Sequence, residues 1–389
     1  MNLLADNSKI IVAPASFKGS LSAPRAAESM MQGIHDALPG AQAEAVPLSD
    51  GGEGLVRVLA TAMDASLRTS LVHGPLEDLQ VQAEWALTND GTTAIIEMAS
   101  AAGLALVPPE RRDPGVTSTY GVGELIVEAL NAGVSKLVVG LGGSATNDGG
   151  AGMAQALGYR FLDDDGHPLP PGGSALRRLH RIDVSRRDAR LDRVSIVAPC
   201  DVVNILTGPQ GAALVYGMQK GGSREALLDL DEALAHFAGI AERDCACVIK
   251  NVPGAGAAGG LGGGVIAFLK GKLKRGIETV LDAVRFDERI AGVDVIITGE
   301  GRLDTQTLQG KVMQGVLKRA RTQSIPVMAV VGSISLPDGV LSSELGFVDV
   351  EELVGEGITL SEAMQEAPEL LHAKTFLLVS RHTGGRRIA

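Results

Sequence analysis

The spacing of apolar residues indicates alternating strands and helices at both ends of the chain. Near the start it predicts a strand in "KIIVAPAS", a helix over residues 26–38 and a second strand in "AEAVPLS". From residue 293 the same order returns in "VDVIITGEGRLD", a helix near residues 312–321, "PVMAVVGS" and "FVDVEELVG", with a last helix from Ser361. Helices between successive strands favour parallel pairing, so we expect the two ends to share one sheet.

The middle of the chain has a different pattern. Short alternating strands such as "VQAEWALT" and "TAIIEMA" occupy residues 67–98, and a long helical pattern covers residues 225–247. A chain of 389 residues is also long for a single core. We therefore expect a two-domain α/β protein. Residues 1–70 and 286–389 would form a discontinuous Rossmann-like domain with a doubly wound parallel sheet, and residues 71–285 a mixed α/β domain.

Composition narrows the classes of partner and compartment. A formal net charge of −11 and an aromatic content of 3% argue against a basic groove with stacking side chains, so no nucleic-acid partner is expected. The start, "MNLLADNSK", has no basic segment before an apolar one, and no stretch approaches the roughly 20 apolar residues of a membrane span. These features predict a cytoplasmic protein without a membrane partner. The spacing of Cys200, Cys245 and Cys247 suggests neither a disulfide framework nor a zinc site.

A polar cluster flanked by glycines is the first candidate for chemistry. "GLGGSATNDGGAGMAQALG", residues 140–158, places Ser144, Thr146, Asn147 and Asp148 between a predicted strand and a helical pattern. One interpretation is an anion site, because glycine lets backbone N–H groups approach a phosphate or carboxylate, with Asp148 holding a cation or taking a proton. The other is turn and helix-capping chemistry, with Asp148 as an N-cap.

Known nucleotide motifs do not fit. "GAGAAG", residues 254–259, matches the dinucleotide fingerprint, but Pro253 stands where the preceding strand should end. A helix-entry loop with close backbone packing is the favoured interpretation. Neither Gly-Lys pair, at residues 271–272 and 310–311, is followed by Ser or Thr, so the chain has no P-loop.

Three further loops place charged residues after predicted strands. They are "PASFKGS" with Ser16 and Lys18, "SDGGEG" with Asp50 and Glu53, and "TGEGRLD" with Glu300, Arg302 and Asp304. In open α/β sheets ligands bind beyond the carboxyl ends of the strands, so we expect these loops to share a crevice. Each charged residue taken alone is more often a solvated surface group.

Six motifs follow one another along the chain: "APASFKGSLSA", "PLSDGGEG", "GGSATNDGGAGMAQALG", "CDVVN", "PGAGAAGGLGGG" and "ITGEGRLDTQTLQGKV". In sequence and order they resemble the type I glycerate kinases, a two-domain family of bacterial glyoxylate and sugar-acid breakdown. The resemblance implies transfer of the γ-phosphoryl group of ATP to D-glycerate, with Mg²⁺, in a cleft between the two domains. The expected product is 2-phosphoglycerate, with the 3-phosphate as the alternative.

Within that reaction we assign three principal roles. Lys18 contacts the phosphates, Arg302 holds the glycerate carboxylate with its planar guanidinium, and Asp201 orients or deprotonates the attacking hydroxyl. The remaining substrate- or phosphate-binding residues are Ser16, Asp50, Ser144, Thr146, Asn147, Asn204, Lys220 and Lys311. The predicted metal ligands are Asp148, Glu300 and Asp304, although Asp304 alternatively forms a structural ion pair with Arg302.

Two other functions and one departure from the family pattern stay open. The chain is alternatively a nicotinamide-dependent hydroxy-acid oxidoreductase, or a non-catalytic sugar-acid-binding protein; a monomer and a homodimer are both compatible with it. Relatives usually begin the first motif Asp-Ser-Phe/Tyr-Lys-Glu, whereas this chain has Ala15 and Gly19 in place of the acids. Ile205 and Met218 replace prolines that are common in relatives.

Overall fold

The chain forms two compact units. The computed structural model describes residues 3–49, 51–52, 54–303, 312–335, 346–355 and 357–383. The first unit comprises Met1–Asp50, Thr61–Met63 and Val280–Ala389, and the second comprises Gly51–Ala60 and Asp64–Thr279. The expected boundary at residue 71 would cut through β3 (Ala65–His73), which pairs with β4 (Gln80–Thr88) along its whole length. The proposed cleft between two domains stays a prediction.

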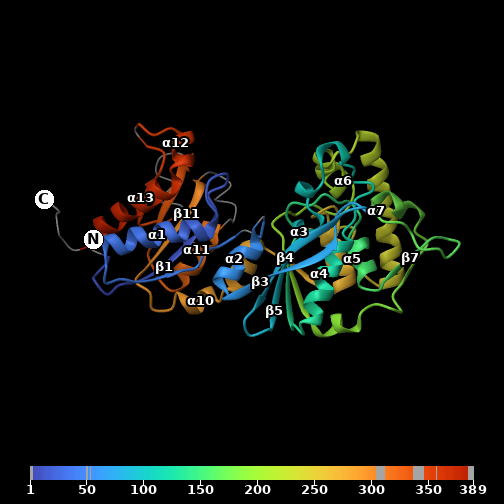
Figure 1. Ribbon diagram of the computed structural model, residues 1–389, viewed down its shortest axis with the longest axis horizontal. Helices are drawn as coiled ribbons and strands as arrows, with labels where there is room; N and C mark the ends of the chain where they lie inside the picture. The colour runs from blue at the N-terminus through green and yellow to red at the C-terminus, as the bar shows by residue number, and fades with distance from the viewer. Residues whose placement is uncertain are drawn as a thin grey trace. The chain divides into compact units, whose positions relative to one another are not determined.

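The first unit contains a parallel five-stranded sheet built from both ends of the chain. Its order is β13-β12-β11-β1-β2, and each neighbouring pair is parallel. The predicted α/β class and the shared sheet are therefore confirmed (Figure 1). The strands are β1 (Lys9–Pro14), β2 (Gln42–Ala45), β11 (Val295–Leu303), β12 (Val327–Ile334) and β13 (Asp349–Glu352). The helices are α1 (Ala23–Ala37), α10 (Phe286–Arg289), α11 (Val312–Thr322), α12 (Leu360–Gln365) and α13 (Ala367–His382).

Alternating apolar residues explain why α1 and α13 cover one face of this sheet. Ile10 and Val12 of β1 point to the same face because side chains two residues apart share a face of a strand. They pack in one core with Met30 of α1 and with Leu371 and Leu378 of α13. Figure 1 shows α1 and α13 side by side. Burial of this apolar surface is the main source of the unit's stability.

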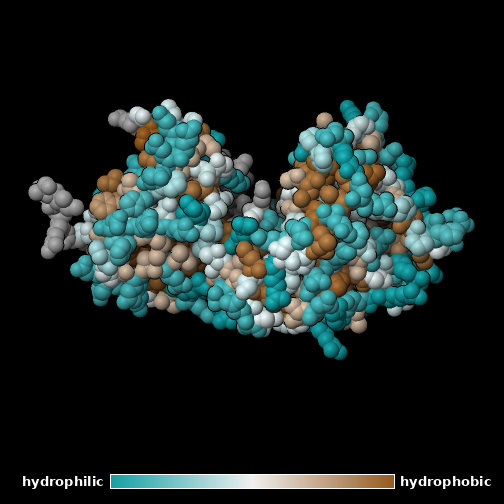
Figure 2. Space-filling model, in the orientation of Figure 1, coloured by the Kyte–Doolittle hydropathy of each residue, from teal (hydrophilic) through white to brown (hydrophobic). Residues whose placement is uncertain are grey.

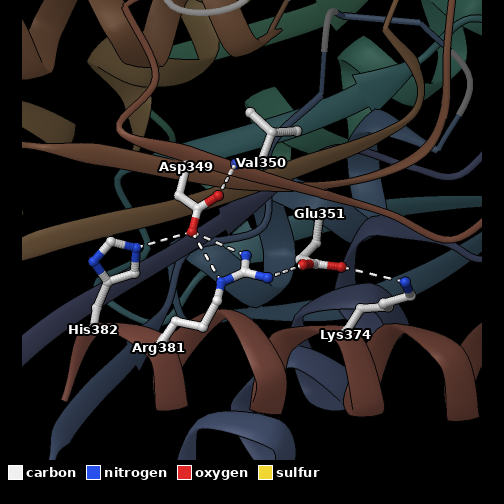
Figure 3. A network of polar contacts seen from close by, with 6 residues as sticks. All are labelled: Asp349, Val350, Glu351, Lys374, Arg381 and His382. Atoms are coloured by element: carbon white, nitrogen blue, oxygen red, sulfur yellow. Dashed lines mark hydrogen bonds and ion pairs between the residues drawn. The ribbon is translucent and has the colours of Figure 1, made fainter.

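A network of charged residues also joins α13 to the edge strand β13 (Figure 3). Asp349 accepts hydrogen bonds from Arg381 Nη2 at 2.9 Å and from His382 Nε2 at 2.9 Å, while Glu351 pairs with Arg381 and with Lys374. Burial raises the pKa of Asp349, but the His382 hydrogen bond and the Arg381 charge outweigh it and leave that pKa below its ordinary value. The network fixes the end of α13 on the sheet.

The second unit contains a mixed six-stranded sheet. Its order is β10-β9-β6-β5-β4-β3, with antiparallel pairing from β3 to β5 and parallel pairing from β5 to β10. The remaining strands are β5 (Thr93–Glu97), β6 (Lys136–Gly140), β9 (Ser195–Pro199) and β10 (Lys272–Lys274), with β7 (Arg160–Leu162) and β8 (Arg181–Asp183) in a separate pair. The helices are α2 (Leu55–Ala62), α3 (Ala99–Ala102), α4 (Tyr120–Asn131), α5 (Ala151–Ala156), α6 (Ala212–Tyr216), α7 (Arg224–Cys245), α8 (Leu261–Leu269) and α9 (Gly276–Ala283).

Several aromatic side chains pack together in the core of the second unit. Phe161, Phe237 and Phe268 lie within 6.4 Å of one another by ring centroid, and Tyr159 makes an edge contact with Phe268. Hydrophilic atoms cover much of the face seen in Figure 2, with hydrophobic patches between them on both units. No helix in the described part of the chain has the length and apolar character needed to cross a membrane.

Candidate active site

Parallel strands bring several of the predicted motifs to one edge of the second unit's sheet. The strands β5, β6, β9 and β10 end at Glu97, Gly140, Pro199 and Lys274. Because they are parallel, the loops that follow them start from the same edge. The polar cluster of residues 144–148 and the "CDVVN" segment are two of these loops. The sequence pattern therefore placed both motifs correctly at strand ends.

The glycines of "SDGGEG" lie against this same edge. Gly54 N donates to Glu97 Oε1 at 2.8 Å, and a Cβ added to Gly51 would lie 2.5 Å from Pro199 Cβ. A larger residue at position 51 would therefore meet the end of β9, and its φ of +88° also favours glycine. Glu97, which the sequence analysis missed, is an acid that ends a buried apolar strand, and that position was the available signal.

Asp148 holds two segments of backbone together. Its Oδ2 accepts hydrogen bonds from Thr119 N and Thr119 Oγ1, both at 2.8 Å, and from Gly152 N at 3.2 Å, while Oδ1 accepts from Gly150 N at 3.1 Å. Thr119 Oγ1 in turn accepts from Met153 N. The carboxylate is 1% exposed, and burial raises its pKa although these hydrogen bonds oppose the rise. Asp148 therefore binds backbone N–H groups at the start of α5, but the N-cap of that helix is Gly150 and not Asp148. Metal binding by Asp148 stays a prediction.

Lys220 lies beneath the polar cluster. It ends the short 3₁₀ turn Met218–Lys220, is 2% exposed, and donates from Nζ to Ser144 Oγ at 2.8 Å and to Thr146 O at 2.7 Å. Burial of the ammonium lowers its pKa to about 7, while the Asp148 carboxylate acts in the opposite direction. Lys220 thus stabilises the loop of residues 144–148 through these two hydrogen bonds. Its contact with a phosphate stays a prediction.

Two side chains of the cluster are buried with unsatisfied polar atoms. Thr146 Oγ1 and both amide atoms of Asn147 have no hydrogen-bond partner among the described residues, and both residues are fully buried. A buried amide without partners costs stability, so such groups ordinarily bind water or a ligand. This is the observation that keeps a binding role for Thr146 and Asn147 under consideration.

The glycines of "GAGAAG" allow close backbone packing against that cluster. A Cβ on Gly259 would lie 1.8 Å from Thr146 O, and one on Gly256 would lie 2.2 Å from Ile205 O. The N–H groups are used within the protein: Gly256 N donates to Asn204 O, and Gly262 and Gly263 donate to carbonyls of the same loop. The loop therefore has the helix-entry form that the sequence favoured, with these donors unavailable to a pyrophosphate.

Asp201 and Asn204 lie in the loop after β9. Asp201 is exposed, and its Oδ1 accepts from Gly276 N at 2.8 Å. Asn204 donates to Gln210 O at 2.8 Å and accepts from Tyr216 OH at 2.7 Å, so its amide shapes the loop. Burial raises the pKa of the neighbouring Cys200 thiol to about 11, which keeps that thiol protonated near neutral pH.

In the first unit, the loop after β1 lies beside the end of β11. Ala15 N donates to Gly299 O at 2.7 Å, and a Cβ on Gly301 would lie 3.2 Å from Lys18 N. Lys18 is exposed and Ser16 is half-buried. The parallel edge thus brings the loop of Ser16 and Lys18 beside the "TGEGRLD" motif, while the crevice expected for all three loops stays a prediction.

Glu300 and Arg302 lie within a strand, not in a loop after it. β11 continues to Leu303 because it pairs with β12 as far as Ile334, with Arg302 opposite Ser333. Glu300 is buried, whereas Arg302 is exposed and donates from Nη2 to Ser335 Oγ at 3.2 Å. The expectation that Glu300 and Arg302 follow the strand was therefore wrong, because both lie within its last four residues.

Three predicted site residues lie outside the described residues: Asp50, Lys311 and Asp304. Glu53 lies outside them as well. Among the residues that are described, no group of three or more His, Cys, Asp or Glu side chains is placed to hold a metal ion. The metal-binding roles of Asp148, Glu300 and Asp304 stay predictions, and no step of the reaction is derived through a metal ion.

Thr119 is a second residue that the sequence analysis missed. It precedes α4, and its N–H and hydroxyl are the strongest described contacts of Asp148. The available signal was a hydroxyl residue immediately before a helical pattern, which is typical of an N-cap. The sequence spacing of 29 residues between the two gives no indication that they meet.

Comparison with known proteins gives the same family along nearly the whole chain. The family model described as "Glycerate kinase family" matches residues 10–380. The glycerate kinase of Halalkalibacterium halodurans is 46% identical over 373 residues, covering 95% of this chain and 98% of the relative. The glycerate 2-kinase of Escherichia coli K12 is 44% identical over 359 residues, covering 92% and 94%.

A solved structure agrees with these sequence relatives. The crystal structure of a protein from Salmonella typhimurium LT2, assigned as glycerate kinase 2, superposes with a TM-score of 0.88 at 41% identity. The match covers 96% of this chain and 98% of that one. Fold, motifs and relatives agree, and the chain belongs to the glycerate kinase family.

Proposed function

We propose that this protein transfers the γ-phosphoryl group of ATP to D-glycerate and forms 2-phosphoglycerate. The observation that carries the proposal is the family match over residues 10–380, together with the relative of 44% identity that is named glycerate 2-kinase. A kinase uses ATP as its phosphoryl donor, and both substrates are small anions. The Rossmann-like, doubly wound description of the first unit and a site between the two units are parts of the same proposal.

The residue roles follow from the chemistry of phosphoryl transfer. That reaction needs positive charge on the phosphates and a group that orients the attacking hydroxyl. The exposed Lys18 ammonium supplies charge, and the exposed Arg302 guanidinium suits two-point binding of the glycerate carboxylate. The Asp201 carboxylate accepts the hydroxyl hydrogen bond. Support for these roles is the exposure of these side chains near the carboxyl ends of parallel strands in the two sheets.

Mg²⁺ enters this proposal only through the nucleotide. Mg²⁺ keeps several waters and binds chiefly to substrate phosphates with one or two carboxylates. When bound, it would neutralise charge on the transferred group. Glu300 directly precedes Gly301, which packs against the backbone of Lys18. It remains our candidate metal ligand, alongside Asp304 and Asp148.

The two alternative functions, oxidoreductase and sugar-acid-binding protein, would require different ligands and give different assay results. An oxidoreductase would bind a nicotinamide dinucleotide at residues 254–259, which is disfavoured because Gly256 N, Gly262 N and Gly263 N already donate within the protein. A sugar-acid-binding protein would bind glycerate without turnover.

An assay of ADP formation separates the three functions. The purified protein with ATP, Mg²⁺ and D-glycerate is expected to release ADP at a rate that depends on glycerate, with L-glycerate and no acid as controls. A change in absorbance at 340 nm with NAD and glycerate, in the absence of ATP, would favour the oxidoreductase. Saturable glycerate binding by calorimetry without ADP release would favour the binding protein.

A further inference from the structure

The edge strand β3 presents hydrogen-bonding groups that no described residue pairs in a sheet. Among the described residues β3 pairs only with β4. Gly74 N donates to Leu79 O, and Asn89 N donates to Asp64 O. The backbone groups of the even-numbered residues of β3 therefore point toward β4. His73 N donates away from β4, to Glu124 Oε2 at 2.7 Å. Because bonding direction alternates along an antiparallel strand, the N–H and C=O groups of Leu67, Thr69 and Leu71 face the open edge.

The same three residues put an exposed apolar pair beside that edge. Residues two apart share one face of a strand, so Leu67, Thr69 and Leu71 lie together. Leu67 is 48% exposed and Leu71 is 60% exposed. On the other face Arg68 lies over the Trp85 ring at 5.4 Å, so its charge is turned toward its own sheet. The strand has no proline and no lysine, two of the residues that ordinarily block edge pairing.

We propose that β3 pairs antiparallel with β3 of a second copy, about a two-fold axis at Thr69. In this register Thr69 faces its own copy, and Leu67 faces Leu71 of the partner subunit in both halves. A two-fold interface must be self-complementary in this way. The segment "LRTSL", residues 67–71, reads apolar, polar, threonine, polar, apolar in both directions.

The outward direction of the odd-numbered backbone groups limits the register to pairings of odd-numbered with odd-numbered residues. Among these pairings, the one centred on Thr69 places Leu67 opposite Leu71 of the partner subunit on both sides of the axis, so both exposed leucines gain an apolar neighbour. A second copy offers the same exposed leucines and the same outward-facing backbone groups, so it matches the strand by shape and hydrogen bonds.

The oligomeric state of the purified full chain tests the proposal. Sedimentation velocity across micromolar concentrations is expected to show a reversible dimer. The double variant Leu67→Lys with Leu71→Lys should raise the dissociation constant at least tenfold, because it places four ammonium groups at the joined edge. Leu228→Lys and Leu377→Lys are matched controls, since those leucines are 51% and 48% exposed on helices, and both should leave dimerisation unchanged.

A cysteine at the axis tests the register itself. Residues opposite each other in a hydrogen-bonded antiparallel pair have Cα atoms about 5.5 Å apart, within the range of a disulfide. Thr69→Cys is therefore expected to form a covalent dimer on mild oxidation, whereas Ser66→Cys and the natural protein do not. A monomer at every concentration, a dimer that survives the double lysine variant, or no Thr69→Cys cross-link would each overturn the proposal. A monomer at every concentration would show that β3 does not pair with a second copy.

Discussion

At the scale of single residues, the buried pair Lys220 and Asp148 gives the second unit a dependence on pH. The Lys220 pKa is lowered to about 7, from an ordinary value near 10.5. Between these values the unfolded chain binds more protons at this position than the folded one, so stability rises with pH. The raised pKa of Asp148 acts in the acid range, where stability falls as pH rises from its ordinary pKa toward the raised one.

We predict that Lys220→Met removes the alkaline part of this dependence. Methionine fills a similar volume and carries no charge. Between pH 7 and 10 the natural protein should gain stability relative to the variant, by at most about 1.4 kcal/mol per pH unit. Thermal unfolding of both proteins across this range measures the effect. Parallel curves would show that Lys220 is not the titrating group.

Two substitutions in the proposed site should act on different kinetic constants. Asp201→Asn is expected to lower kcat by about 100-fold or more with little change in KM, because a group on the attacking hydroxyl acts mainly in the transition state. Arg302→Lys should raise KM for glycerate roughly tenfold with less effect on ATP, because lysine loses the two-point geometry. Steady-state rates with each substrate varied measure both. A normal kcat for the first variant, or a normal glycerate KM for the second, removes that residue's role.

Ala15 is a third residue with a measurable consequence. It is buried, and its N–H donates to Gly299 O beside Glu300. The family motif that the sequence resembles has aspartate at this position, so Ala15→Asp restores the acid of that motif. If the acid orders Lys18, kcat/KM with D-glycerate should rise about tenfold, or about 1.4 kcal/mol in transition-state stabilisation. Equal values would show that the natural alanine is neutral, and a fall would show that burial of the acid outweighs its use.

At the scale of elements, apolar spacing was enough to predict the longer helices and several of the strands. The predicted helix over residues 225–247 is α7, Arg224–Cys245, and the predicted helix near residues 312–321 is α11, Val312–Thr322. The end of β11 was missed because "GEGRL" is rich in glycine and charge, while its pairing with β12 keeps it extended. Local residue preferences gave way there to a neighbouring strand.

The candidate site was harder to predict for a related reason. A polar cluster between glycines has the same sequence whether it faces a ligand or the protein. The partners that decide, Thr119, Lys220 and Gly259, lie far from residues 144–148 along the chain. Their meeting depends on the tertiary fold, which no spacing rule contains.

The packing of the glycine-rich loop can be tested directly. Gly259→Ala should destabilise the second unit by several kcal/mol, because its Cβ would overlap Thr146 O, and overpacking against backbone is costly. Gly133→Ala is the matched control: its φ of +80° is also positive, but an added Cβ meets nothing within 4 Å. It should cost about 1 kcal/mol. Chemical denaturation compares the two, and equal losses would contradict the close packing.

At the scale of the whole molecule, each unit has predicted site residues near the carboxyl ends of its parallel strands, in an all-parallel sheet in the first unit and in a mixed sheet in the second. Lys18 and Arg302 belong to the first unit, and Asp201 belongs to the second. Neither set alone supplies the phosphate, carboxylate and hydroxyl contacts that the proposed reaction requires. Activity is therefore expected to need both units of the chain.

The most direct test of this account is the identity of the product. The purified protein is incubated with ATP, Mg²⁺ and D-glycerate, and the reaction is followed by ³¹P nuclear magnetic resonance against authentic 2- and 3-phosphoglycerate. The account predicts that the ATP γ-phosphate signal is lost as the 2-phosphoglycerate and ADP signals grow in equal amounts. Stable ATP with no phosphoglycerate of either kind would contradict the central claim that this chain is an active glycerate kinase.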